Sequence, residues 1–323
     1  MQGKDALSAV LRGVRLTGGV QFCFMPAGAW RTDDRTRLGE IAGPVRGVIP
    51  FHIMAEGRCW IRCQQREEYL EPGDVVMFPL GCAHQLGAGS GDTPLNPLGD
   101  LPQAPWDHVP ILKYGGDQDR VRMMCGFLAC DAMEFQPIRD TMPEMILVRT
   151  RDPSEAGWLG AAVDQIIIET DQPSAGGQTV LERLTEMMFV ELLRREVTAA
   201  ADASEGWLAA LSDPAIGRCL SAIHENPSHD WTIDELAHIA GASRSVLSER
   251  FQALLGAPPV RYVRNWRLHL ASRKLLETQE PIAAIAFDAG YSTEAAFNRA
   301  FKSCFGDTPA AWRAARTPGR RQA

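Results

Sequence analysis

Several features that would place this chain in a specialised class are missing from its 323 residues. No apolar run approaches the roughly 18 residues that a membrane-spanning helix needs. The first residues also lack the basic-then-apolar order of a secretory signal, so we expect a cytoplasmic protein with no membrane partner. A composition of 45% hydrophobic and 23% charged residues matches ordinary globular proteins and argues against wholesale disorder.

The eight cysteines lack the spacing of a specialised site. They stand at positions 23, 59, 63, 82, 125, 130, 219 and 304, without a C-x-x-C pair, so neither a disulfide scaffold nor a zinc ribbon is indicated. Cys59 and Cys63 share one side of a predicted strand, and Cys82 lies two residues from His84, whose positive charge could lower a thiol pKa. Redox or electrophile sensing by Cys59, Cys63 and Cys82 is one hypothesis, and buried inert thiols are the favoured alternative.

Basic residues are concentrated towards the end of the chain. From Ala215 onward, fourteen Arg and Lys stand against ten Asp and Glu, which gives a net charge of +4. Because the whole chain carries −7, the preceding residues carry −11. This distribution is expected if only the tail meets nucleic-acid phosphates, although a solvated charged face gives the same count.

The amino-terminal part of the chain has the pattern of strands and turns. The apolar run Val45–Met54 ends at the turn signal Glu56-Gly57 and restarts at Arg58–Cys63, which predicts a β-hairpin. The segment 87–110 is rich in Gly, Pro and Asp and is predicted to be a loop outside the core. Another strand is predicted at 120–130.

The pattern becomes helical after about residue 154. Helices are predicted at 158–168 and at 179–197, where the second carries an apolar stripe of Leu181, Leu184, Met188 and Leu192. Two amphipathic helices need a partner surface. They either cover the predicted sheet or form a dimer interface.

The last hundred residues contain one pattern twice, beginning at Leu236 and again at Ile285. Each copy has the parts of a helix-turn-helix unit. In the first, the capping box Thr232–Glu235 starts a helix, Gly241 ends it and Ser243 caps the next helix. The second copy has Pro281 at its start, Gly290 at the helix end, and Ser292 or Thr293 as the next cap.

The second helix of each copy has one apolar and one polar face. Leu247 with Phe251, and Phe297 with Phe301, are four residues apart and should face the core. The opposite faces are suited to base edges and phosphates in a major groove. The predicted DNA-binding residues are Ser243, Arg244, Ser245, Ser248, Glu249, Thr293, Glu294, Asn298, Arg299 and Lys302. The alternative is a solvated face of a helical bundle.

The stretch from Trp231 to Arg313 resembles the DNA-binding domain of the AraC/XylS family of bacterial regulators. The resemblance is carried by Ala-Gly-Tyr291, by Phe-Asn-Arg-Ala-Phe-Lys302, by Phe-Gly-Asp-Thr-Pro309 and by Trp312-Arg313. It implies two helix-turn-helix units joined by a long helix at Pro259–Glu277, which enter successive major grooves. On that helix, Arg261, Arg264, Arg267 and Arg273 are expected to be surface, structural or phosphate-contacting residues.

Residues 45–130 resemble a cupin domain, the sensor half of AraC-like regulators. Gly73-x5-Pro79-x-Gly81-x2-His84 matches the second cupin motif, and His52-x3-Glu56 matches the end of the first. Pro50 stands where metal-binding cupins have a first histidine. The resemblance implies a ligand pocket near His52, Glu56 and His84.

A metal site is one hypothesis for this pocket. His52 and His84 could share a divalent ion with Glu56 or with Cys125 as third ligand, and imidazole with thiolate would favour zinc. A purely structural or ligand-contacting histidine pair is the more common alternative.

We therefore predict an α+β multidomain protein that is a sequence-specific transcriptional regulator and not an enzyme. Its expected parts are a cupin-like β-barrel sensor (1–150), a helical connector (151–205) and an all-α DNA-binding domain (206–323). The expected partners are double-stranded DNA, RNA polymerase and a small-molecule, metal or redox effector, and the expected output is activation. A metallo-cupin enzyme fused to a DNA-binding domain is the rival, disfavoured by the incomplete ligand set. A DNA-repair protein would need a cluster of closely spaced cysteines, which the sequence lacks.

Overall fold

The computed structural model describes residues 5–32, 47–90, 93–103, 106–152, 157–201, 203 and 205–316. The chain forms two compact units, and each is discontinuous in sequence, whereas the predicted domains are continuous. The helical unit comprises Met1–Val14, Glu134–Thr141 and Glu196–Ala323, and the sheet unit comprises Arg15–Met133 and Met142–Arg195.

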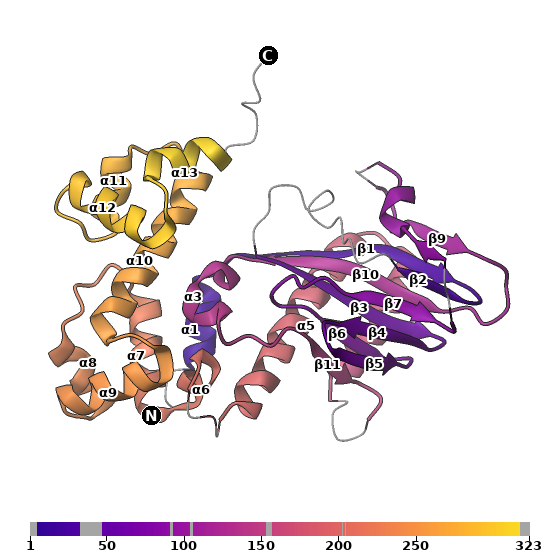
Figure 1. Cartoon of the computed structure of the whole chain (residues 1–323), viewed down its shortest axis with the longest axis horizontal. Coiled ribbons are helices and arrows are strands. Elements are labelled where there is room, and N and C mark those ends of the chain that lie inside the picture. The colour runs from indigo at the N-terminus through magenta and orange to yellow at the C-terminus, as the bar shows by residue number, and fades with distance from the viewer. Residues whose placement is uncertain are drawn as a thin grey trace, which may run out of the picture. The chain divides into compact units, whose positions relative to one another are not determined.

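The sheet unit contains two sheets, whose strands are labelled in Figure 1. A six-stranded sheet has the order β11-β6-β3-β10-β1-β9, and a five-stranded sheet has the order β5-β4-β7-β2-β8. The strands are β1 (Leu16–Pro26), β2 (Trp30–Thr32), β3 (Val48–Glu56), β4 (Cys59–Cys63), β5 (Arg66–Leu70), β6 (Asp74–Met77), β7 (Gln85–Ala88), β8 (Pro94–Leu95), β9 (Ile111–Tyr114), β10 (Arg122–Cys130) and β11 (Ile146–Arg149).

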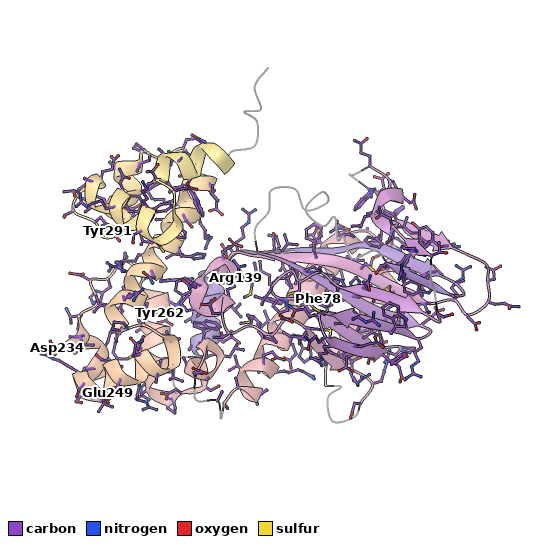
Figure 2. All side chains as sticks on the ribbon, in the orientation of Figure 1. Phe78, Arg139, Asp234, Glu249, Tyr262 and Tyr291 are labelled. Carbon is purple, nitrogen blue, oxygen red and sulfur yellow. The ribbon has the colours of Figure 1, made fainter. Side chains whose placement is uncertain are left out.

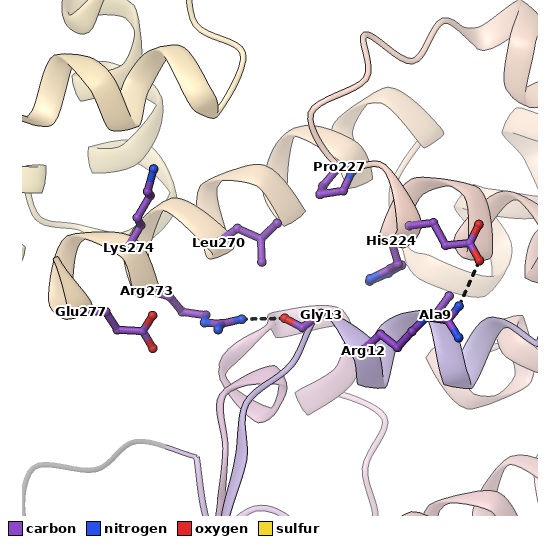
Figure 3. A pocket seen from close by; sticks show the side chains of 10 residues that line it. Ala9, Arg12, Gly13, His224, Pro227, Leu270, Arg273, Lys274 and Glu277 are labelled. Carbon is purple, nitrogen blue, oxygen red and sulfur yellow. Dashed lines mark hydrogen bonds and ion pairs between the residues drawn. The ribbon is translucent and has the colours of Figure 1, made fainter. Parts of the chain in front are cut away.

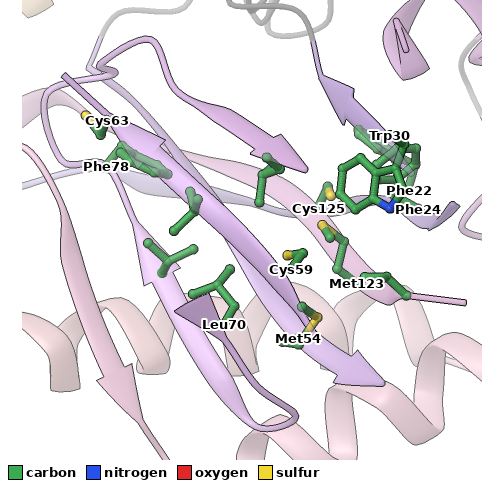
Figure 4. Close-up of a cluster of buried hydrophobic side chains, with 14 of the residues drawn as sticks. Phe22, Phe24, Trp30, Met54, Cys59, Cys63, Leu70, Phe78, Met123 and Cys125 are labelled. Carbon is green, nitrogen blue, oxygen red and sulfur yellow. The ribbon is translucent and has the colours of Figure 1, made fainter. Parts of the chain in front are cut away.

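The core of this unit takes side chains from both sheets (Figure 4). In β4, Cys59, Ile61 and Cys63 are buried, whereas the intervening Trp60 and Arg62 are not, as the two-residue period of a strand requires. Aromatic rings pack within this core, and Phe24 meets Trp30 edge to face with ring centroids 5.3 Å apart.

The predicted hairpin between β3 and β4 is wrong. β3 pairs with β10 and β6 in one sheet, whereas β4 pairs with β5 and β7 in the other. Gly57 lies in the turn between them with φ at +79°, and a Cβ atom there would stand 2.8 Å from the carbonyl oxygen of Arg120. The turn therefore carries the chain from one sheet to the other rather than back along its neighbour.

The segment 87–110 is also more ordered than predicted. Pro94–Leu95 forms β8, which pairs with β2, and Pro97–Asp100 forms the 3-10 helix η1. Because Leu95, Leu98 and Leu101 pack against the core, the prediction of a loop outside the core is wrong for these residues.

The two predicted connector helices are confirmed as α4 (Leu159–Asp171) and α5 (Gly177–Ala199). α5 lies against the six-stranded sheet. Gly19 of β1 is so close to α5 that a Cβ atom added to it would stand 3.6 Å from the Cα atom of Glu182. No helix among the described ranges is long and apolar enough to cross a membrane.

The helical unit contains the two predicted helix-turn-helix units. The first is α8–α9 and the second is α11–α12, and α10 joins them with the bounds that the resemblance implies. The helices of this unit are α1 (Ala6–Arg12), α3 (Gln136–Arg139), α6 (Trp207–Ser212), α7 (Pro214–Glu225), α8 (Ile233–Ala240), α9 (Arg244–Leu255), α10 (Pro259–Glu277), α11 (Ile282–Asp288), α12 (Glu294–Phe305) and α13 (Pro309–Arg316). The 3-10 helix η2 (Asp131–Glu134) precedes α3.

The helix ends form as the residue types predict. Thr232 and Glu235 complete a reciprocal capping box at the start of α8, and Gly241 ends that helix with φ at +67°. The hydroxyl of Ser243 accepts a hydrogen bond from the backbone N–H of Val246. In the second unit Thr293, rather than Ser292, is the N-cap of α12.

Among the helices that were not predicted, α1 and α3 lie in the first half of the chain but belong to the helical unit. α1 packs on α7 and buries Leu7 and Val10. Just before α3, Phe135 places its ring against Tyr262 and Trp266 of α10, with centroids 5.4 and 5.0 Å apart. Segments from the first half of the chain thus complete the core around α10.

Candidate nucleic-acid interface and buried histidine site

The first candidate reading helix is α9. Leu247 and Phe251 are fully buried, so the helix can turn only its other side outward. Figure 2 shows Glu249 at the outer rim of the helices, with Tyr262 inside them. Of the five residues predicted here, Ser243, Arg244, Ser245 and Glu249 are exposed and Ser248 is half-buried.

The second candidate helix, α12, repeats this arrangement. Phe297 and Phe301 are buried with ring centroids 5.5 Å apart. On the opposite side, Thr293, Glu294, Arg299 and Lys302 are exposed and Asn298 is half-buried. The structure therefore brings the predicted residues together on two polar helix faces.

The predicted base-reading residue Arg244 has an ion-pair partner that the sequence analysis did not identify. Its guanidinium binds the carboxylate of Asp234 on α8, and the two side chains are 67% and 58% exposed. Exposed pairs of this kind contribute about 0–1 kcal/mol, so a phosphate or a base can displace the carboxylate at low cost. Because Asp234 and Arg244 lie on different helices, no sequence pattern indicates this ion pair.

The arginines of α10 divide into two groups. Arg267 donates to the carbonyl oxygens of Pro227 and His229, at 2.7 and 2.5 Å, and Arg273 donates to that of Gly13 at 2.7 Å. These two hold loops and helices of the unit in place. Arg261 and Arg264 are exposed, so they are the members of the set that can meet phosphates.

Comparisons with known proteins agree with this geometry. A family model described as Cupin matches residues 5–198, and a helix-turn-helix domain model matches residues 236–315. A putative AraC-like transcription regulator from Streptomyces antibioticus is 36% identical over 277 residues, which cover 82% of this chain and 87% of that protein. The chain belongs to the AraC-like transcription regulators. It is a DNA-binding regulator with a cupin domain.

A second relative extends the match to nearly the whole chain. The regulator AlkR from Acinetobacter baylyi is 32% identical over 324 residues, covering 96% of this chain and 99% of that protein. Among solved structures, the DNA-binding domain of AdpA in complex with a target DNA is 28% identical and covers 35% of this chain and all of that one, with a TM-score of 0.32. The predicted α+β class, with a cupin half and a helix-turn-helix half, is confirmed.

Inside the cupin half of this AraC-like regulator, His52 and His84 meet directly. Their Nε2 atoms are 2.7 Å apart, and the Nδ1 atom of His52 lies 3.1 Å from the Sγ atom of Cys125. The Nδ1 atom of His84 lies 2.9 Å from the carbonyl oxygen of Cys82. The rings of Phe78 and His84 stack at 3.8 Å, which covers the pair on one side.

These contacts fix the positions of the protons. A carbonyl oxygen only accepts, so His84 donates from Nδ1 and its Nε2 atom accepts from His52. The Nδ1 atom of His52 then accepts from the Cys125 thiol. Burial, with a smaller contribution from His84, holds the pKa of His52 well below its ordinary value, and burial raises the pKa of the Cys125 thiol. Both groups are therefore neutral, as this one-directional chain requires.

The predicted metal ligands do not fit one ion in this arrangement. Cys125 and His84 occupy the two opposite nitrogen atoms of His52, so a single ion cannot contact all three. The carboxylate of Glu56 is 62% exposed and pairs with Arg122 at 3.4 Å instead. Over the described part of the chain, no cluster of three or more His, Cys, Asp or Glu residues could hold a metal.

The three redox candidates lie in or beside the same core. Cys59 and Cys63 are buried and Cys82 is half-buried, and the thiols of Cys63 and Cys82 hydrogen-bond to each other. Burial raises the pKa of Cys59 to about 12 and of Cys63 to about 11. Burial, followed by the nearby charge of Glu144, also raises the pKa of Cys82, opposite to the direction expected from a neighbouring histidine.

Proposed function

We propose that this regulator reads two successive major grooves with α9 and α12, and that its cupin half adjusts this binding in response to a small-molecule or redox signal. The first part of this proposal rests on the polar face that α9 and α12 each present, in two helix-turn-helix units that α10 joins. α10 sets the separation of the two faces because it packs against both helix-turn-helix units.

Base reading is tested with the full chain. Arg244→Ala and Asn298→Ala should each relax preference at a few base pairs and cost about 1–3 kcal/mol if their contacts are bidentate. The two affected positions should lie about 10 base pairs apart, because the helices enter successive grooves. Binding to a selected site and to random DNA is measured for each variant.

Arg183→Ala is the matched control, since Arg183 is 69% exposed and pairs with Glu186 on α5. It should leave DNA affinity unchanged. Affinity of the unmodified chain should fall steeply with salt because phosphate contacts release counterions. Equal losses on specific and random DNA would show that Arg244 and Asn298 touch only phosphate.

The input is assigned to the buried chain Cys125–His52–His84. It ends at the carbonyl of Cys82, whose thiol is half-buried, so a change at the edge of the core reaches its centre through hydrogen bonds. A ligand or an oxidant shifts an equilibrium only by acting differently on two arrangements of such an element. The hydrogen-bonded chain from Cys125 to His84 therefore supports a sensor role for the cupin half that does not require a metal.

His84→Ala removes the acceptor of the His52 Nε2–H group. DNA affinity of the full chain should change about 5-fold or more, the usual range of coupling between sites. Near-UV circular dichroism checks that the core remains folded. Tyr69→Phe, at a half-exposed ring on β5, is the control. An affinity identical to that of the unmodified chain would contradict the coupling.

The other expected partners stay predictions. A homodimer would need an apolar contact, and the exposed side chains of Ile168, Val180 and Met187 on α4 and α5 are the candidates. Contact with RNA polymerase, and activation of transcription rather than repression, also stay predictions.

A further inference from the structure

We infer that Cys63 and Cys82 form a reversible disulfide when the protein meets a hydroperoxide, which makes this thiol pair a redox input of the cupin half. The two thiols already hydrogen-bond to each other. Cys63 is 2% exposed, whereas Cys82, which packs against the same core, is half-buried. Solvent therefore reaches one sulfur of the pair. The inference rests on the proposed function only in its effect on DNA binding.

The strands bring the two side chains to the same face of the five-stranded sheet. β4 and β7 are antiparallel neighbours with Arg62 opposite Gln85, and continuing that register sets Cys63 opposite His84. Both of these residues are buried, so their side chains point into the core. Side chains two positions apart in an extended segment point the same way, and Cys82 therefore follows His84 towards Cys63.

Access distinguishes this pair from other thiols of the core. Cys23, Cys59 and Cys125 are each at most 3% exposed. Figure 4 shows Cys63 apart from Cys59 and Cys125. An oxidant that enters from solvent therefore meets Cys82 first, and Cys63 is the thiol that already touches it.

The oxidation proceeds in two steps whose atoms balance. The Cys82 sulfur takes one oxygen from the hydroperoxide and becomes a sulfenic acid, while the O–O bond breaks and the other oxygen leaves with the Cys82 proton as water or an alcohol. The Cys63 sulfur then attacks the Cys82 sulfur. The S–S bond forms, the S–O bond breaks, and the hydroxyl leaves with the Cys63 proton as water. Two thiols thus lose two electrons, which the peroxide gains, and an added dithiol reverses the bond by exchange.

Ionisation of the thiols sets the rate of the first step. Burial raises the pKa of Cys63 to about 11, and burial, followed by the charge of Glu144, raises the pKa of Cys82. The thiolate is the reactive form, so attack is slow near neutral pH and should become about tenfold faster per pH unit up to the pKa of Cys82. The pair should therefore respond to lasting rather than brief exposure to an oxidant.

The disulfide acts on the neighbouring histidine pair. Two bonded sulfur atoms stand about 2 Å apart, closer than two hydrogen-bonded thiols, so the segment around Cys82 must move towards β4. Cys63 is held by its pairing with Arg66 across the turn to β5. The carbonyl oxygen of Cys82 is the atom that lies 2.9 Å from the Nδ1 atom of His84. Oxidation therefore changes the hydrogen bond that orients His84 towards His52.

The cavity of the helical unit does not offer an equivalent input. It has a volume of about 800 Å³ and lies between α1, α7 and α10. Figure 3 shows Arg12 bound there to Glu225, and Arg273 bound to the carbonyl oxygen of Gly13. No cysteine stands among the described residues that line this cavity, so a thiol-based signal cannot enter through it.

The test treats the full chain with hydrogen peroxide and maps the disulfides by tryptic digestion without reduction. Trypsin cuts on both sides of residues 63–66, whose only cysteine is Cys63, and the next peptide, residues 67–113, holds only Cys82. Mass spectrometry should find these two peptides joined after peroxide treatment and separate again after dithiothreitol. The assignment is overturned if peroxide leaves them separate, if Cys82 stops at a sulfinic or sulfonic acid, or if it joins another cysteine.

Three variants locate the effect. Cys63→Ala and Cys82→Ser should each prevent the joining, and Cys82 is half-buried, so its replacement spares the core if Cys63→Ala fails to fold. Cys304→Ser, at an exposed thiol of the helical unit, is the matched control and should leave the joining unchanged. A control variant that also prevents it would contradict the pairing.

DNA binding separates this inference from the proposed function. Peroxide should change the DNA affinity of the unmodified chain about 5-fold or more, and Cys82→Ser should abolish that response. If the disulfide forms while the affinity stays the same, the thiol pair is confirmed as a modification site and the proposed coupling of the cupin half to DNA binding is contradicted.

Discussion

At the scale of single residues, Tyr262 holds the core of the helical unit together. It is 1% exposed, and its hydroxyl joins Trp207 of α6 to His224 of α7. Tyr262→Phe would keep the ring but leave a buried indole N–H and a buried imidazole nitrogen without partners. The free energy of unfolding should fall by about 1–3 kcal/mol, measured by urea denaturation.

Tyr69→Phe is the matched control for this prediction. Tyr69 is 48% exposed, and Arg58 lies over its ring rather than at its hydroxyl. Removing the hydroxyl oxygen of Tyr69 should change the free energy of unfolding by less than about 0.5 kcal/mol. Similar losses in both variants would mean that the Tyr262 hydroxyl does not stabilise the unit.

At the scale of elements, α7 and α10 each bury a histidine. Burial is the main cause that lowers the pKa of both His224 and His269 to about 3, with smaller effects of His269 on the former and of Arg273 on the latter. In the unfolded chain their pKa returns to about 6.5. Between these values the unfolded state binds more protons, so stability is full above about 6.5 and is lost as pH falls.

Two such groups give a slope of up to about 2.7 kcal/mol per pH unit in that range. Urea denaturation of the helical unit, followed at several pH values from about 7.5 to about 5, measures it. His269→Gln should remove about half of the slope, because one proton fewer is taken up on unfolding. A slope that is unaffected by this substitution would assign the acid sensitivity to other groups.

At the scale of the whole molecule, the two units share the chain in an interleaved way. Phe135 lies in the first half of the sequence, yet it is 3% exposed and its ring contacts Tyr262 and Trp266 of α10. Phe135→Ala should therefore destabilise the helical unit by about 3–5 kcal/mol. Hydrogen exchange of the α10 amides separates this loss from any change in the sheet unit.

Phe287→Ala is the control at this scale, because Phe287 is 68% exposed on α11 of the same unit. It should change stability by less than about 0.5 kcal/mol. If Phe135→Ala left the α10 amides as protected as Phe287→Ala does, α3 and its flanking residue would not be part of the helical core.

Much of the helical unit could be predicted because its determinants are local. Thr232 with Glu235, and Thr293, begin helices through side-chain caps, and Gly241 ends one through its backbone conformation, so each acts within one or two turns. Strands β3, β4 and β10 were located for a similar reason, from the residue pattern within each segment. The pairing of β3 and β4 was not, since each takes its partners from distant parts of the chain.

The sequence by itself determined the two helix-turn-helix units and the polar faces of α9 and α12, because caps and periodic burial operate between residues a few positions apart, whereas the bounds of α10 came from the family resemblance. The tertiary structure alone decided that Asp234 pairs with Arg244, that His52 binds His84 and Cys125 in a single hydrogen-bonded chain, and that α1 and Phe135 complete the core around α10. Asp234 and Arg244 lie on adjacent helices, and the other contacts join residues far apart in the chain, whose partners are selected by burial and packing of the whole unit rather than by any local pattern.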